Sequence, residues 1–303
     1  MVKKNNPYFL AIDLGSSGGI IMSGSFSGNK LELKEIDRFV IGMTNIYDNW
    51  YWNVYQFFEN IKKGISKSVG QFGYPASGMA INTWGVDFGL LSENGELMGL
   101  PFAYRDPRTD GIFEKFFKII SKEDLYKLTG IQLMQINSIF QLYAMKIRNH
   151  PFLKMAKDLL FIPDILNYFF TGKKNTEFSF ATTSQMYNPI QKRWEQKIFE
   201  KMEIPMNIMQ DIIEPGTEIG VIKKSIGDET GASNLKVFAP VSHDTGSAVA
   251  AVPACEKNWA YISSGTWSLL GVETKSPIIS PTASRLNFTN EGGLTPLSGY
   301  KKT

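Results

Sequence analysis

Apolar and polar positions alternate along three segments near the N-terminus, at residues 9–14, 19–26 and 31–39. Turns that contain Gly and Asn separate them, so the pattern predicts a three-stranded β-meander. Over residues 54–72 the apolar positions recur every three or four residues, which predicts a helix with one buried face. Residues 76–81 are short and apolar and precede an irregular polar stretch, as in a buried parallel strand.

A hairpin is predicted next, with strands at residues 85–91 and 97–103 and a turn at Asn94-Gly95. Between about 111 and 205 the pattern becomes helical. Start and stop signals within it are an N-cap residue, an early proline and two terminal glycines: Ser121, Pro163, Gly130 and Gly172.

Strand character returns at residues 237–241, and the small residues 245–252 suit a closely packed helix. Pro253 then marks the expected boundary between a domain of residues 1–252 and a second domain of residues 253–303. The segment 260–274 reads as two further strands around a turn.

Composition narrows the class of protein but not its function. The chain has 303 residues, 43% hydrophobic and 20% charged, and a net charge of +3, which indicates a folded protein and excludes wholesale disorder. This balance calls for neither a nucleic acid nor a membrane partner, and it leaves the oligomeric state open. Cys255 is the only cysteine, so no intrachain disulfide is possible. The first apolar run ends at Asp13, too early for a signal peptide, and we expect a cytoplasmic protein.

Two distant segments share one pattern, a strand, a turn of Gly with Ser or Thr, and a second strand. They are FLAIDLGSSGGIIMSG at residues 9–24 and AYISSGTWSLLGVET at residues 260–274. Such turns bring backbone N–H groups close to an anion, and their hydroxyls add donors. Two of them facing each other would hold a polyphosphate, which makes a phosphotransferase the leading hypothesis.

Two carboxylates stand where ligands of α/β sheets gather, although each has a simpler interpretation. Asp13 ends a strand before the first turn, where it would hold Mg²⁺ or merely start the turn. Asp244 follows His243 at a strand-to-helix turn, where it would face a ligand or merely cap the helix. The chain contains neither a Walker A nor a GxGxxG sequence.

Five stretches resemble the FGGY family of carbohydrate kinases, and its rhamnulokinase branch most closely. They are AIDLGSS (11–17), NTWGVDFGLL (82–91) with YRDPRT (104–109), SHDTGSAVAAVPA (242–254), YISSGTWSLLGVE (261–273) and NFTNEGG (287–293). The resemblance implies an α/β fold of two ribonuclease-H-like domains of the actin–hexokinase superfamily, the second incomplete. It ends near Gly293, and LTPLSGYKKT (294–303) matches no part of the family pattern, as a one-nucleotide frameshift near that codon would explain.

The resemblance also implies residue roles. Asp244 would be the general base, with ATP as phosphate donor and Asp13 organising Mg²⁺. The phosphates would be held by Gly15, Ser16, Ser17, Gly265 and Thr266. The ketose site would comprise Gly85, His243, Thr245 and Asn290, and the role of Trp84 and Asp87 is left open between sugar contact and fold support.

The implied reaction is ATP-dependent phosphorylation of a small-molecule ketose, L-rhamnulose to L-rhamnulose 1-phosphate. Alternatives are another ketose kinase of the family, for fuculose or xylulose, and a non-catalytic remnant that binds sugar or nucleotide. An actin-like or heat-shock-protein-like ATPase would lack the sugar motifs. Since the second domain is expected to be incomplete, we expect the 303-residue chain to be impaired or inactive alone.

Overall fold

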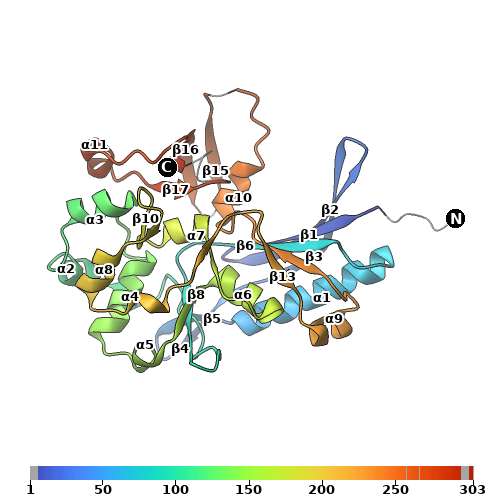
Figure 1. Ribbon diagram of the computed structural model, residues 1–303, viewed down its shortest axis with the longest axis horizontal. Coiled ribbons are helices and arrows are strands. Elements are labelled where there is room, and N and C mark those ends of the chain that lie inside the picture. The colour runs from blue at the N-terminus through green and yellow to red at the C-terminus, as the bar shows by residue number, and fades with distance from the viewer. Residues whose placement is uncertain (1–5, 257, 266, 295–299, 303) are drawn as a thin grey trace.

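A six-stranded mixed sheet forms the centre of the computed structural model, which describes residues 6–256, 258–265, 267–294 and 300–302 (Figure 1). Its strand order is β13-β14-β6-β1-β2-β3. The strands are β1 (Tyr8–Leu14), β2 (Gly18–Ser27), β3 (Lys30–Val40), β6 (Gly78–Thr83), β13 (Glu218–Val221) and β14 (Lys236–Phe238). Strands β1, β6 and β14 run parallel, and β2, β3 and β13 pair antiparallel with their neighbours.

One face of this sheet packs on three helices, α1 (Val54–Phe72), α6 (Ile162–Thr171) and α9 (Lys224–Thr230), which lie together below it in Figure 1. Alternate residues of β1 are buried, as a half-covered strand requires. Helix α1 has an N-cap at Asn53, whose side chain accepts from the backbone of Gln56, and it ends at Gly73 in the left-handed conformation. Its buried apolar residues Val54, Phe57, Ile61 and Ile65 belong to the same hydrophobic core as the strands of the sheet.

A helical region inserted between β7 and β13 has a second, aromatic-rich core. Its helices are α2 (Ile112–Phe116), α3 (Lys122–Thr129), α4 (Ser138–Ile147), α5 (Pro151–Met155), α7 (Phe178–Thr183) and α8 (Gln196–Met202), with short 3₁₀ turns at Pro107–Thr109 and Met206–Ile208. Four strand pairs complete it and the adjoining loops: β4 (Met43–Ile46) with β5 (Asn49–Trp52), β7 (Phe88–Leu91) with β8 (Asp158–Phe161), β9 (Thr176–Glu177) with β12 (Ile212–Ile213), and β10 (Tyr187–Asn188) with β11 (Arg193–Trp194).

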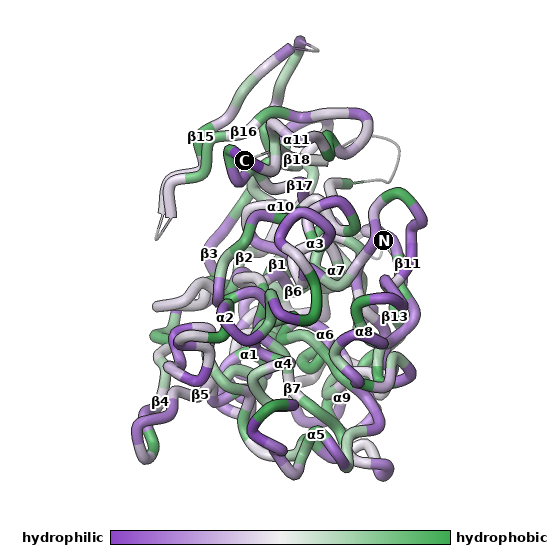
Figure 2. Tube along the Cα trace, turned by 90° about the vertical axis from the view of Figure 1, so that its left-hand side faces the viewer, coloured by the Kyte–Doolittle hydropathy of each residue, from purple (hydrophilic) through white to green (hydrophobic). Residues whose placement is uncertain are grey.

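The C-terminal part forms a second sheet above the first, on the far side of α10 (Asp244–Ala250) (Figure 1). Its order is β15-β16-β18-β17, from β15 (Ala260–Ser264), β16 (Ser268–Thr274), β17 (Asn290–Gly292) and β18 (Tyr300–Lys302), with α11 (Pro281–Arg285) beside it. Figure 2 shows green, hydrophobic segments of β15 and β16 at the outside of the molecule. Ile262 and Leu270 are 72% and 64% exposed there.

Most predicted elements are confirmed. The meander, the helix over 54–72, the parallel strand after it, the hairpin around residue 265 and the caps at Ser121, Gly130 and Gly172 all form. The hairpin of residues 85–103 is confirmed only next to its turn. There Gly95 N donates to Ser92 O, Met98 N donates to Leu90 O, and Leu91 and Leu97 form an antiparallel bridge. The extended ladder of β7 is formed with β8 instead, and residues 97–103 form only isolated bridges.

The domain boundary at residues 252 and 253 stays a prediction. Among the described residues, no helix combines the length and the apolar character needed to cross a bilayer.

Candidate active site

Three parallel strands end at the same edge of the central sheet, and the predicted site residues follow them. Asp13 lies near the end of β1 and pairs in register with Asn82 of β6. Thr83 N donates to Ser242 O across 2.9 Å, which holds the segment before Asp244 beside the end of β6. Since ligands of α/β sheets bind outside the carboxyl ends of the strands, this edge is the expected place for a site.

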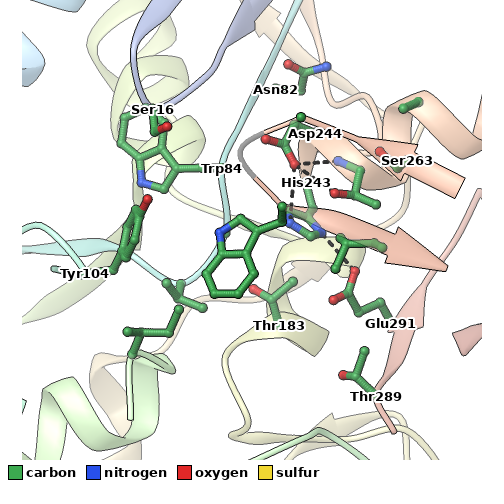
Figure 3. Close-up of a pocket in the computed structure, with 18 of the residues that line it drawn as sticks. Ser16, Asn82, Trp84, Tyr104, Thr183, His243, Asp244, Ser263, Thr289 and Glu291 are labelled. Carbon is green, nitrogen blue, oxygen red and sulfur yellow. Dashed lines mark hydrogen bonds and ion pairs between the residues drawn. The ribbon is translucent and has the colours of Figure 1, made fainter. Parts of the chain in front are cut away.

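A cavity of about 580 Å³ opens between this edge and the C-terminal sheet. Eight of the predicted site residues line it: Asp13, Gly15, Ser16, Gly85, His243, Asp244, Thr245 and Gly265. Trp84, Tyr104, Thr183 and Glu291 also line it (Figure 3). Residues from both ends of the chain therefore meet in one cavity.

Asp244 is the first residue of α10, and its side chain is 35% exposed. Its Oδ1 accepts hydrogen bonds from the backbone N–H and the hydroxyl of Thr245. Asp13 faces the same space, and its pKa is raised, first by burial and then by the negative charge of Asp244. The repulsion between two nearby carboxylates is relieved when a cation binds between them or when one of them takes up a proton.

His243 lies between two carboxylates. Its Nδ1 is 3.0 Å from Oε2 of Glu291, and its Nε2 is 3.4 Å from Oδ1 of Asp244 (Figure 3). The ring packs on Gly85, where an added Cβ would lie 3.2 Å from His243 Nε2. Gly85 thus serves the site by leaving room for the imidazole.

Asn290 does not line the cavity among the described residues, so its predicted role in the ketose site stays a prediction. Asn290 is fully buried, donates to Gly130 O across 2.8 Å and accepts from Ile278 N across 2.7 Å. Successive residues of a strand point to opposite faces, so β17 buries Asn290 and presents Glu291 to the cavity. The sequence analysis missed Glu291, although it stands in the same NEGG stretch.

The two Gly-Ser turns face the cavity from opposite sheets. In the first, Gly15 N donates to Gly18 O across 2.9 Å, and Gly15 and Ser16 line the cavity. Ser17 is exposed and does not line the cavity, and its backbone carbonyl accepts a hydrogen bond from Ile41 N in the meander. In the second, Gly265 N donates to Trp267 O across 2.8 Å. Thr266 lies outside the described residues.

A cation site is supported by one atom that the sequence analysis overlooked. Asn82 Oδ1 is buried at the cavity wall, and no described residue gives it a hydrogen-bond partner. Asn82 stands opposite Asp13, so an amide oxygen and a carboxylate lie together. Among the described residues no cluster of three His, Cys, Asp or Glu side chains forms a metal cage. Mg²⁺ commonly takes only one or two protein ligands beside phosphate and water oxygens.

A buried carboxylate supports the cavity wall from behind. Asp87 accepts from the indoles of Trp52 and Trp84 and from Gln141 Nε2, and burial raises its pKa to about 6. Arg108, buried beside it, donates to the carbonyl of Gln141's side chain. Trp84 lines the cavity and Asp87 does not. The two residues, whose roles the sequence left open between sugar contact and fold support, therefore occupy different positions relative to the cavity.

The family model "FGGY family of carbohydrate kinases, N-terminal domain" matches residues 8–251. The chain belongs to the FGGY family of carbohydrate kinases. It is 42% identical to a rhamnulokinase of Bacteroides thetaiotaomicron over 286 residues, covering 94% of this chain and 59% of that protein. A rhamnulokinase of Oceanobacillus iheyensis is also 42% identical, with 94% and 60% covered. The chain thus spans about 60% of the length of these FGGY relatives.

Solved structures show that the fold is the actin–hexokinase-like fold of FGGY kinases. A gluconate kinase of Lactobacillus acidophilus superposes with a TM-score of 0.84 at 16% identity, covering 98% of this chain and 59% of that one. Plasmodium falciparum glycerol kinase with ADP gives 0.81 at 12% identity, with 98% and 60% covered. The predicted fold class is confirmed.

Proposed function

We propose that this chain acts in the ATP-dependent phosphorylation of a ketose, with L-rhamnulose as substrate and L-rhamnulose 1-phosphate as product. The observation that carries the proposal is the position of Asp244. Its partly exposed carboxylate stands at the carboxyl edge of the central sheet, in a cavity that the two Gly-Ser turns enter from opposite sides. The similarity to rhamnulokinases at 42% identity supports the same reaction.

Asp244 would accept the proton of the attacking sugar hydroxyl. Phosphoryl transfer depends mainly on positioning and on neutralising charge, so one aimed carboxylate covers the proton chemistry. The hydrogen bonds from Thr245 fix the orientation of Asp244 but leave its second oxygen without a partner in these contacts. His243 and Gly85 would shape the ketose site beside it, and the turns that contain Gly15 and Gly265 would face the phosphates.

Mg²⁺ fits the donor set of Asp13 and Asn82, since both offer oxygen ligands. When bound, the ion would neutralise phosphate charge as the γ-phosphoryl group moves. Asp13 and Asp244 line the same cavity, and a cation between them would offset the repulsion between the two carboxylates. Thr266, outside the described residues, remains in the proposal as a phosphate ligand on sequence grounds.

The test measures ADP release and sugar binding separately, with L-rhamnulose, L-fuculose and D-xylulose. A rhamnulokinase releases ADP fastest with L-rhamnulose.

Asp244→Asn should lower kcat about 10²–10⁴-fold and leave the Kd for ketose within about twofold, because the amide keeps the shape but accepts no proton. Thr217→Ala, on a surface turn, is the control. A variant that retains half the wild-type rate would remove Asp244 from the role.

A second candidate is ketose binding without turnover. It is favoured by the exposed apolar residues of β15 and β16, among them Ile262 and Leu270. In that case calorimetry detects L-rhamnulose binding, but ketose adds nothing to ADP release. Efficient ketose-dependent ADP release by the 303-residue chain contradicts this second candidate, and absence of both signals contradicts both candidates.

A further inference from the structure

A buried glutamate of the helical region holds the chain segment that leads to Asp244. Glu177 directly precedes α7, and only 1% of its surface is exposed. Its Oε2 accepts a hydrogen bond of 2.9 Å from the backbone N–H of Ser242, a residue 65 positions further along the chain. Since Ser242 comes two residues before Asp244, this bond ties the start of α7 to the start of α10.

The same segment is held at three backbone groups. The carbonyl of Ser242 accepts from Thr83 N of β6 across 2.9 Å, opposite to its bound N–H. The hydroxyl of Ser179, in the first turn of α7, donates to the buried carboxylate and accepts from His243 N across 3.3 Å. The backbone is therefore fixed on both sides immediately before α10 begins.

The length of the Glu177 side chain fits two tasks. Its carboxylate accepts from the backbone N–H groups of Ser179 and Phe180, which caps α7, and also from Ser242 N. Ser, Thr, Asp and Asn are the usual N-cap residues, and their shorter side chains suffice for a cap alone. An ionised carboxylate only accepts hydrogen bonds, so it suits all of these donors. The additional methylene group of glutamate accounts for the reach to Ser242.

We propose that Glu177 is a positioning residue, which holds the backbone of Ser242 and His243 so that Asp244 enters the cavity at a fixed place. The consequence for catalysis rests on the proposed function, in which Asp244 accepts the proton of the sugar hydroxyl. The alternative role is a cap for α7 with no effect on Asp244. Two substitutions separate these roles, because one keeps the cap and the other keeps the reach.

Glu177→Asp keeps the cap and loses the reach. Amide exchange is measured without ketose or nucleotide at pH 8, since burial raises the pKa of Glu177 to about 7. Exchange at Ser242 should accelerate at least about tenfold, whereas Ser179 and Phe180 should stay within about threefold of the wild type. Unchanged exchange at Ser242 overturns the proposal.

Glu177→Gln gives the opposite pattern and serves as the second variant if the aspartate form does not fold. Its amide oxygen should take the place of Oε2, because the other orientation would turn the NH₂ group against the N–H groups of both Phe180 and Ser242. The NH₂ group then faces Ser179 N. Exchange should accelerate at Ser179 and stay within about threefold at Ser242. Faster exchange at Ser242 than at Ser179 in this variant overturns the proposal.

Glu195→Asp is the matched control. Glu195 is the N-cap residue of α8, is 7% exposed and accepts from Lys197 N and from Asn188 Nδ2. The same shortening of a buried capping glutamate should leave exchange at Ser242 unchanged. If this control accelerates Ser242 as much as the aspartate variant at position 177 does, the effect is a general loss of stability and the proposal is wrong.

The kinetic readout is kcat with L-rhamnulose. Glu177→Asp should lower kcat about 10–100-fold, since a misplaced base accepts the proton poorly, and Glu177→Gln should lie between that variant and the wild type. Glu195→Asp should keep kcat within about twofold. Rapid exchange at Ser242 with an unchanged kcat contradicts the positioning role. A wild-type chain without kinase activity contradicts the proposed function, whereas the exchange measurements still decide whether Glu177 holds the segment before Asp244.

Discussion

The indole N–H of Trp84 donates a hydrogen bond of 2.9 Å to Oδ2 of Asp87, a carboxylate with no exposed surface. The same oxygen accepts from Trp52 Nε1 across 2.6 Å and from Tyr104 N across 3.1 Å. Trp84 and Tyr104 both line the cavity. One buried carboxylate therefore fixes two parts of the cavity wall that lie about twenty residues apart in the chain.

Removing this carboxylate should destabilise the protein strongly. Asp87→Ala leaves two indole N–H groups and a backbone N–H buried without an acceptor, so we expect a loss of about 3–5 kcal/mol. Asp87→Asn keeps one acceptor oxygen and should cost less than half of that. Urea denaturation followed by tryptophan fluorescence measures both. Equal stability of the alanine variant and the wild type would contradict the network.

Asp87 also predicts a pH dependence. Burial raises its pKa to about 6, so the folded state keeps the proton to higher pH than the unfolded state does. The contribution of Asp87 to stability is therefore complete below pH 4 and falls by about 3 kcal/mol as the pH rises through 6. Asp87→Asn removes this step. Subtracting the two stability profiles from pH 4 to 8 isolates it from the other buried carboxylates.

The sequence predicted the central sheet because its elements are coded locally. Alternation in β1 and the three-to-four spacing in α1 each describe one buried face, and caps such as Ser121 and Gly130 mark their own helix ends. Asp13 and Asp244 could be placed together because both follow parallel strands, whose carboxyl ends share an edge.

What the sequence could not predict depends on partners distant in the chain. Residues 88–91 have a good turn after them, yet they pair with 158–161, because that strand buries them in the aromatic core. The NEGG motif predicted that this segment reaches the cavity, but the side chain that lines the cavity is Glu291 and not Asn290. Strand register, set by contacts of Asn290 with Gly130 and Ile278, decides that Glu291 faces the cavity.

Gly85→Ala tests how closely His243 packs. The new methyl group would lie 3.2 Å from Nε2 and 3.3 Å from Cδ2 of His243, so the ring must move by a few tenths of an ångström. We expect ketose affinity to fall at least about tenfold, or 1.4 kcal/mol, with a smaller change in stability. Gly42→Ala, where a methyl group meets nothing within 4 Å, is the control. Calorimetric titration with L-rhamnulose compares the two.

Asp164→Asn should stabilise the protein increasingly as the pH rises. Asp164 is 2% exposed in α6, and burial, followed by the charge of Glu177, raises its pKa well above the ordinary value. Its stabilising contribution is present at low pH and is lost as the pH rises through the folded-state pKa, whereas asparagine loses nothing. Thermal unfolding at pH 5 and pH 8 measures the difference. Asp228→Asn, on the exposed surface of α9, should show no such trend.

Asn290→Ala separates a structural role from a ligand-binding one. The substitution removes the acceptor of Ile278 N and the donor to Gly130 O, both inside the buried junction between β17 and the helical region. Amide exchange of Ile278 should therefore accelerate, and stability should fall by about 1–3 kcal/mol. If Asn290 is not a sugar ligand, the Kd for L-rhamnulose should change less than about threefold, because Glu291 and His243 remain in place. A large loss of sugar affinity with unchanged exchange at Ile278 would reverse this conclusion and return Asn290 to the ketose site.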